Sequence, residues 1–264
     1  MFNLKKQKMK KKIISMVLFT CGLLFIPGVA FCQQFVMTAE YINKDIYGNL
    51  QDKTKVSGEY TRDLKEGPVR WNNVYISHSD NQSGVYKENI KQEYMEGFSY
   101  VVSSHIMDET FFNDFPKQPD NVLARNLIWD MMMIEGYAWN YTDSLELNKT
   151  FVIPDIQGSF DMADIGSYDH EKNELKWIGT SMMNSTLCNI IEYNSLGNKL
   201  EINLNEMKSK GSELYWGNIW ISQKDRKIEY AEIYSFTVQE LEIQGFPQKI
   251  LLTTKRVVTI EKKK

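Results

Sequence analysis

The sequence predicts a mainly β protein in which one large curved antiparallel sheet, a half-barrel, packs against one main α-helix. Three patterns indicate this fold. Short runs of alternating apolar and polar residues, separated by turn residues, begin near position 55. The last third of the chain holds three longer runs of the same kind. Between these regions, one stretch near 120–136 repeats its apolar residues at helical spacing.

The first strands are predicted from short alternating runs that end at turn residues. Gly67-Pro68 ends one run and Ser79-Asp80-Asn81 ends another. The run over 94–103 is rich in aromatic and β-branched residues, which suit a pleated surface. The predicted strands in this part of the chain cover residues 55–60, 69–76, 84–90 and 94–103.

The middle of the chain predicts a helix over 120–136. Asp120 or Asn121 is a suitable N-cap, and Gly136 is expected to end the helix. Few residues of this helix are polar enough to face solvent, so most of its circumference should lie against apolar surface, which the sheet provides. The apolar positions at helical spacing are Leu123, Leu127, Ile128, Met131, Met132 and Ile134. The exposed-face candidates are Arg125, Asn126, Asp130 and Glu135.

The second half of the chain predicts a meander of antiparallel strands with short turns, of which Asn184-Ser185 is one. The predicted strands cover 158–168, 175–183, 186–193, 212–222, 228–243 and 248–261. On 228–243 one side is mostly polar, and the other side is expected to face the core. That expected core side carries Ile228, Tyr230, Tyr234, Phe236 and Val238. The strand 212–222 is apolar on both sides, which indicates cover on both faces.

The charge balance excludes one broad class of function. The chain has 264 residues, with 31 Lys and Arg against 34 Asp and Glu and a net charge of -3. Six lysines and no acidic residue lie in residues 1–32, so the remainder is acidic, and a strongly basic nucleic-acid binder is excluded. With 42% hydrophobic residues, the stretch 33–264 is expected to form a single β-rich domain.

The first 32 residues predict a secretory signal peptide. A basic stretch over 5–12 runs into an apolar stretch that Pro27-Gly28 ends. The apolar stretch is shorter than the roughly 20 residues that a membrane-spanning helix needs. Cleavage after Cys32 places the small residues Ala30 and Cys32 at the positions that signal peptidase constrains and leaves Gln33 as the new terminus. We therefore expect an exported protein.

A second interpretation makes Cys32 the lipidated first residue of an outer-membrane lipoprotein. Val29 and Ala30 suit the positions before such a cysteine. Phe31 argues against it, because a small residue normally stands directly before a lipidated cysteine. Cleavage after Cys32 is the favoured interpretation, and a lipid anchor on Cys32 stays open as the alternative.

Cysteine usage indicates the compartment. Only Cys188 is certain to lie outside the leader, so the mature chain has no internal disulfide. An exported chain of this size without disulfides fits a bacterial periplasm or an association with the outer membrane. Cys188 lies among apolar residues of a predicted strand and is expected to be a small core residue.

No catalytic, metal or cofactor signature is present, so we expect a protein that is not an enzyme. The segment Gly97–Val101 lacks the closing glycine of a G-x-S-x-G elbow, and no phosphate-binding G-x-x-x-x-G-K occurs. The acidic cluster over 161–171, which includes His170, lacks the glycine and the oxygen spacing of a calcium loop. A solvated turn accounts for it better than a metal site.

The residues that remain as candidates are apolar. Methionine and aromatic side chains suit an adaptable apolar pocket, because the thioether is flexible and the rings supply large area. They gather on and after the predicted helix and on one strand. The candidate ligand-binding residues are Trp129, Met132, Met133, Trp139, Trp216 and Trp220.

The chain resembles the outer-membrane lipoprotein carrier (LolA/LolB-like) class of bacterial envelope proteins. The resemblance covers the plan of most of residues 40–261, especially Lys176-Trp177-Ile178-Gly179 and the strands from Tyr215-Trp216-Gly217 to the C-terminus. It implies a half-open β-barrel that wraps helices and encloses a cavity for acyl chains. No individual functional residue carries over, and this chain has one clear helix where the class usually has more.

Two hypotheses of function follow. In the first, an exported envelope protein binds a lipid, an acyl group or another apolar small molecule in a cleft between the sheet and the helix, without catalysis. In the second, it is a structural or interaction protein of the outer envelope that docks another envelope protein through an exposed sheet face or edge.

Overall fold

The computed structural model describes residues 33–62, 67–80, 83–101, 109–116, 120–154, 158–162, 166–204 and 206–263. The side chain of Trp139 and the predicted leader with its cleavage site at Cys32 lie outside the described residues.

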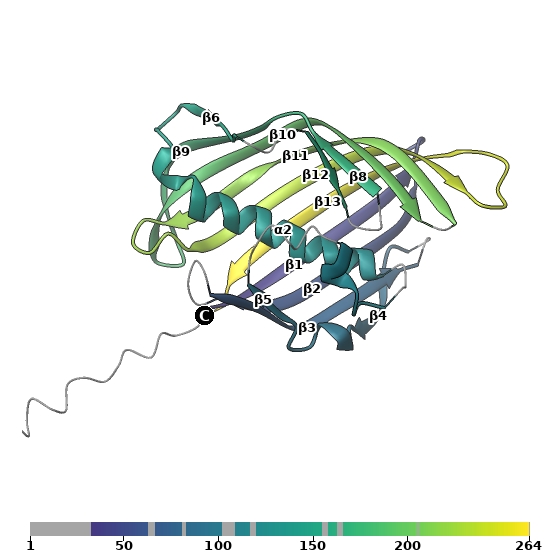
Figure 1. The fold of residues 1–264 in the computed structure, drawn as a ribbon, viewed down its shortest axis with the longest axis horizontal. Helices are drawn as coiled ribbons and strands as arrows, with labels where there is room; N and C mark the ends of the chain where they lie inside the picture. Colours follow the sequence, from purple (N-terminus) through teal and green to yellow (C-terminus); the bar gives the residue numbers. More distant parts are fainter. Residues whose placement is uncertain are drawn as a thin grey trace, which may run out of the picture. The chain divides into compact units, whose positions relative to one another are not determined.

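The described strands form one large antiparallel sheet of 13 strands, which is open. Its main path runs β4-β3-β2-β1-β13-β12-β11-β10-β8-β7. Figure 1 shows the sheet curving around the helix α2, with β2 and β3 on one side of the helix and β8 and β10 on the other. The strands are β1 (Gln33–Asp45), β2 (Leu50–Arg62), β3 (Pro68–Ser79), β4 (Tyr86–Lys91), β5 (Ser99–Val101), β6 (Thr150–Val152), β7 (Gly158–Asp161), β8 (Gly166–His170), β9 (Asn173–Met183), β10 (Thr186–Leu204), β11 (Met207–Ser222), β12 (Ile228–Ile243) and β13 (Ile250–Lys262). The predicted fold class, a curved antiparallel sheet with one main helix, is confirmed.

The sheet branches at β10, because this long strand pairs with two different neighbours on the same side. Its first half pairs with β9 and its second half with β8. A shift of register between Ser195 and Asn198 separates the halves. Gly197, between these two residues, has φ +81°, a conformation that glycine adopts without a steric cost. The branch brings β7 and β8 to the far side of the helix.

Several predicted strands have different bounds in the structure. The strand β1 was not predicted, although Phe35, Met37 and Ala39 alternate along it and are buried. The predicted strand over 94–103 is wrong in its first half, which is the 3₁₀ helix η1 (Glu93–Met95). Gly97 turns the chain there with φ +72°, and β5 is the extended part of this predicted strand within its described residues, 94–101.

The predicted core side of β12 is wrong, and a β-bulge explains the error. Ile228 is buried and pairs with Ile221, but the register shifts directly afterwards, so that Tyr230 pairs with Trp220. The extra residue moves every following side chain to the other face. Ala231 and the alternate residues after it therefore face inward, and Tyr234, Phe236 and Val238 lie on the outer face.

The strand β11 is also covered on one face only, which corrects the expectation of cover on both. Tyr215 and Ile219 face inward, whereas Leu214 and Trp216 on the opposite face are each 37% exposed. The outer faces of β11 and β12 together form an apolar strip, in which the rings of Trp216 and Tyr234 stack with centroids 5.8 Å apart.

The helix α2 spans Asn121–Asn140 and does not end at Gly136 as predicted. Tyr137 and Ala138 are buried beyond that glycine, and the ring of Tyr137 packs 4.9 Å from that of Tyr193 on β10. This packing continues the helix past the glycine. Two further 3₁₀ helices, η3 (Glu109–Phe112) and η4 (Thr142–Ser144), flank α2 in the sequence.

Three of the four helix residues that were expected on the exposed face are buried: Arg125, Asp130 and Glu135. Glu135 accepts a hydrogen bond of 2.9 Å from the hydroxyl of Tyr60 and forms an ion pair of 3.5 Å with Arg62, both on β2. Asp130 forms a buried ion pair with Arg256 on β13. The helix is thus held to the sheet by charges as well as by apolar packing.

The main core lies where α2 meets β1, β2 and β3. Trp71, Tyr60 and Met37 are among its largest fully buried side chains. Phe112 of η3 packs edge to face on Trp129 of α2, with ring centroids 5.5 Å apart. Among the described residues, no helix combines the length and the apolar character that crossing a membrane requires.

We expect Glu135→Ala to lower the free energy of unfolding by about 3 to 5 kcal/mol, because it removes the buried carboxylate with which the buried Arg62 forms an ion pair. Urea unfolding followed by circular dichroism measures the change. Glu146→Ala breaks the exposed pair between Glu146 and Lys149, in which both side chains are 69% exposed, and should leave stability nearly unchanged. Similar small losses in both variants would contradict the structural role of the buried pair.

Candidate functional site

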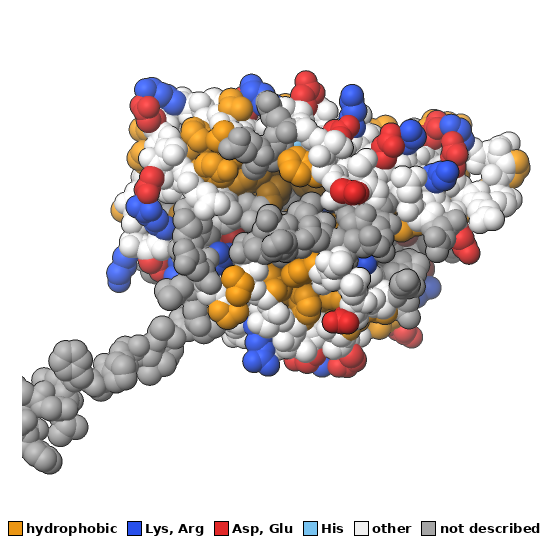
Figure 2. Space-filling model, viewed as in Figure 1, with side chains coloured by type: hydrophobic (Ala, Val, Ile, Leu, Met, Phe, Trp, Pro, Cys, Tyr) orange, Lys and Arg blue, Asp and Glu red, His pale blue; other side chains and the backbone are white. Residues whose placement is uncertain are grey.

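A cavity of about 560 Å³ lies between α2 and the concave face of the sheet. This volume is within the range of roughly 300 to 1,000 Å³ that is typical of small-molecule pockets. Its described lining comes from α2, from β1, β8 and β10 to β13, and from the segment 160–162. Figure 2 shows hydrophobic side chains gathered on the face that carries the helix, with charged side chains mostly around the outline of the molecule.

The helix side of the cavity is largely apolar, although Asn126, Asp130 and Asn140 of α2 also line it. Trp129, Met132 and Met133 of α2 contribute to this wall, and Gly136 leaves it without a side chain at one position. A Cβ atom added at Gly136 would meet only the Nδ2 atom of Asn140, at 4.0 Å. Apolar side chains from β7, from the residue that follows it and from the second half of β10 complete this wall: Phe160, Met162, Leu200 and Ile202.

The sheet side of the cavity is polar, because the bulge in β12 turns its polar side inward. Ser235, Thr237 and Gln239 of β12 line this floor, together with Asn43 of β1 and Thr254 of β13. In the sequence Ser235 and Thr237 alternate with Tyr234 and Phe236, and the polar side of this strand was expected to face away from the core. The cavity is therefore amphipathic, with an apolar wall opposite a polar floor.

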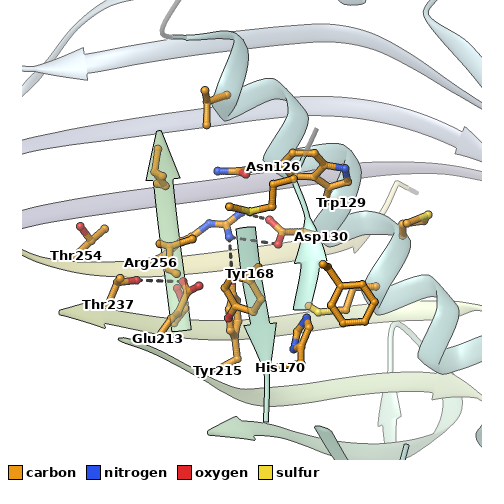
Figure 3. Close-up of a pocket in the computed structure, with 18 of the residues that line it drawn as sticks. Asn126, Trp129, Asp130, Tyr168, His170, Glu213, Tyr215, Thr237, Thr254 and Arg256 are labelled. Atoms are coloured by element: carbon orange, nitrogen blue, oxygen red, sulfur yellow. Dashed lines mark hydrogen bonds and ion pairs between the residues drawn. The ribbon is translucent and has the colours of Figure 1, made fainter. Parts of the chain in front are cut away.

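Arg256 of β13 is the central cation of the floor. Its guanidinium pairs with Asp130 of α2 and donates a hydrogen bond of 3.1 Å to the hydroxyl of Tyr215 (Figure 3). It also lies 4.9 Å from the ring centre of Tyr41. Its Nε is buried and has no hydrogen-bond partner among the described residues. The positive charge is thus balanced within the protein, although one N–H still faces no acceptor.

Glu213 of β11 is buried beside the ion pair, and Figure 3 shows it near Tyr168 and Tyr215. Burial raises the pKa of its carboxyl, and neighbouring hydroxyl groups, including those of Tyr168, Thr237 and Ser235, partly oppose this rise. Thr237 donates to it at 3.1 Å. The buried hydroxyl groups of Tyr168 and Ser235 make no hydrogen bond of normal geometry with any described residue. Burial, and then the nearby Glu213 carboxylate, raise the pKa of Tyr168.

His170 lies on β8 and lines the cavity, which corrects its assignment to a solvated turn. Its ring packs against those of Tyr168 and Phe160, with centroids 4.7 and 5.3 Å away. Burial lowers the pKa of His170 to about 4, so the imidazole is neutral near pH 7.

The structure brings together half of the residues that the sequence singled out. Trp129, Met132 and Met133 line the cavity. Trp216 and Trp220 do not, because they alternate with the inward residues of β11 and so lie on the outer face. The sequence placed them in the cleft because an apolar side was taken to be a core side. Whether any of these residues binds a ligand stays a prediction.

Sequence reasoning missed the polar residues of the floor. Arg256 shares a face of β13 with Val258 and Ile260, and this position in an otherwise apolar series was a signal of a buried cation. Glu213 and Tyr168 had no comparable signal, because acidic and aromatic residues are frequent on exposed strands.

Other chemistry was also sought in the described part of the chain. No group of three or more His, Cys, Asp or Glu side chains comes together there in a way that would hold a metal ion. Cys188 is fully buried, as expected for a core residue, and burial raises the pKa of its thiol to about 11.

Comparisons with known proteins give no assignment. No family model and no curated protein matches the chain. A structure on lipid-protein interactions in lipovitellin is similar with a TM-score of 0.41 and 9% identity, and the match covers 88% of this chain but only 25% of that one. The binding domain of botulinum neurotoxin serotype C1 is similar with a TM-score of 0.14 and 8% identity, over 89% of this chain and 80% of that one. A DUF1329 family protein from Desulfovibrio piger has a TM-score of 0.14 and 8% identity, over 88% and 85%. These values carry no argument about function, which therefore rests on the cavity itself.

We expect His170 to make the fold less stable in acid. Because its pKa falls from about 6.5 in the unfolded chain to about 4 in the fold, its neutral form contributes stability above pH 6.5, and this contribution is lost as the pH falls towards 4. The loss at pH 4 is at most about 3 kcal/mol. Urea unfolding of the wild type and of His170→Gln over this pH range should show the extra loss in the wild type alone. Parallel curves would contradict a buried neutral imidazole.

Proposed function

We propose that this protein binds a lipid, an acyl chain or a similar apolar small molecule in the cavity between α2 and the sheet, and that its action is binding without catalysis. The observation that supports this most is the apolar wall formed by Trp129, Met132 and Met133 at one side of a cavity of about 560 Å³. Methionine and tryptophan side chains adapt to flexible apolar ligands.

Burial of the ligand is sufficient to drive such binding. Each CH₂ group removed from water contributes about 0.8 kcal/mol, so an acyl chain gains affinity without a dedicated polar residue. This explains how a binding site can exist in a chain that has no catalytic or metal motif. The architectural resemblance to outer-membrane lipoprotein carriers fits the same proposal.

We further propose that the protein is exported and acts in a bacterial periplasm or in association with the outer membrane. The support is the order of residues 1–32, with a basic stretch, an apolar stretch and small residues before Gln33. A lipid anchor on Cys32 is the alternative form of the same proposal.

A second candidate function is docking of an envelope partner through the outer face of the sheet. One observation favours it: the outer strip exposes Leu214 and Trp216 at 37%, Phe236 at 36% and Val238 at 51%. Contiguous apolar side chains of this kind often mark interaction surfaces. The cavity and the strip lie on opposite faces, so the two candidates can be tested separately.

We expect Gly136→Leu to fill the cavity, because the added side chain starts in open space on the apolar wall. The affinity for N-phenyl-1-naphthylamine, a neutral apolar fluorophore, should fall at least about tenfold, which corresponds to about 1.4 kcal/mol. Gly136→Ala is the matched control. It should keep binding and gain about 0.5 to 1 kcal/mol of stability, because alanine is the better helix former.

Native mass spectrometry of the same proteins separates the two candidate functions. A light hydrophobic adduct on the wild type and on Gly136→Ala, but not on Gly136→Leu, supports the cavity. A self-assembled or partnered species without an adduct supports the outer strip instead. Equal probe binding by both Gly136 variants would refute the cavity as the site.

The export proposal is tested by the intact mass of the protein from bacterial cells that express the full chain. We expect a mature form that begins at Gln33, recovered from the periplasmic fraction. A heavier form that begins at an acylated Cys32 would show the lipid anchor. The full-length mass in the cytoplasm would contradict export.

A further inference from the structure

The charged groups of the cavity wall leave no free cation for an anionic ligand. The acidic and basic side chains in the described lining, counting histidine and leaving tyrosine aside, are Asp130, Glu213, Arg256 and His170. Arg256 is already paired with Asp130. His170 is neutral near pH 7, because it is partly buried and packs against two aromatic rings. Glu213 therefore stands on the floor without a counter-ion among these lining residues.

The floor nevertheless offers hydrogen bonds to a ligand. Tyr168 and Ser235 are buried residues, 8% and 1% exposed. Their hydroxyl groups make no hydrogen bond of normal geometry with any described residue. Each can donate one hydrogen bond and can also accept. When Glu213 is ionised, its carboxylate only accepts, and Thr237 supplies one donor at 3.1 Å. A buried polar group without a partner is costly, so a ligand that supplies one gains affinity.

A hydroxyl or primary amide group on the ligand satisfies both needs. It can donate to Glu213 and accept from Tyr168 or Ser235. A carboxylate can only accept, and it would place a second negative charge beside Glu213, so that one of the two carboxyl groups would have to take up a proton. The apolar chain of either ligand would lie along Met132 and Met133.

We propose that the cavity selects a lipid whose polar end is uncharged and carries a hydroxyl or amide group, in preference to the same chain with an anionic end. This selection rests on the proposed function, because it assumes that an acyl chain enters the cavity. Glu213 acts as the discriminating group, and Asp130 balances the charge of the Arg256 guanidinium, of which only Nε has no hydrogen-bond partner among the described residues.

The test compares monolauroylglycerol with laurate, which share one acyl chain, near pH 8 and below their critical micelle concentrations. Competition with N-phenyl-1-naphthylamine gives both affinities. We expect the neutral lipid to bind at least about tenfold more tightly than laurate to the wild type. In Glu213→Gln the charge is removed but an acceptor remains, so laurate should gain affinity and the ratio should approach one.

Glu240→Gln is the matched control, because Glu240 is on the same sheet, makes an ion pair with Lys249 and does not line the cavity. It should leave the ratio unchanged. Equal or tighter binding of laurate to the wild type would overturn the selection while leaving the proposed function intact. Tighter binding of laurylamine than of monolauroylglycerol would also overturn it, since Glu213 would then be a counter-ion. If no probe binds at all, the proposed function itself fails.

Discussion

Two buried ion pairs that join α2 to the sheet are the constraint on which the rest of the structure depends. Glu135 pairs with Arg62 on β2, and Asp130 pairs with Arg256 on β13. Separating a buried charge from its partner is strongly unfavourable, so the helix cannot slide or turn without breaking one of these pairs. Met132 and Met133 lie between the two paired positions in the sequence of the helix and line the cavity. The pairs thus hold an apolar helix surface opposite a floor on which it does not fully pack.

The distribution of polar residues on β12 gives the cavity its character. A single bulge after Ile228 moves Ser235 and Thr237 to the inside and Tyr234 and Phe236 to the outside. The inner face therefore offers hydroxyl groups near Glu213, and the outer face carries an apolar strip. A sheet without this bulge would place the aromatic side chains beneath the helix, where they would occupy the space that is now the cavity.

The sequence was sufficient to predict the fold class, because antiparallel strands leave a periodic pattern and short turns. It was not sufficient to predict details that depend on a one-residue shift in the pairing of two strands. The prediction of which face of β12 lies in the core was wrong, because period-two alternation does not reveal a bulge. The predicted end of α2 was wrong, because tertiary packing of Tyr137 continues the helix past Gly136. For the candidate site, the helix residues were predictable from their composition. The partners of Asp130 and Glu135 were not, since Arg256 is 126 residues away from Asp130 and no local pattern links them.

The central claim is that an acyl chain occupies the space that the ion-paired helix leaves above the sheet. A crystal structure with a monoacylglycerol whose acyl chain carries bromine tests it directly, because anomalous scattering locates the bromine atoms. The account predicts bromine between Met132 or Met133 on the helix and Leu200 or Ile202 on β10. Bromine on the outer face beside Trp216, or α2 packed onto the floor with no space between them, would contradict it.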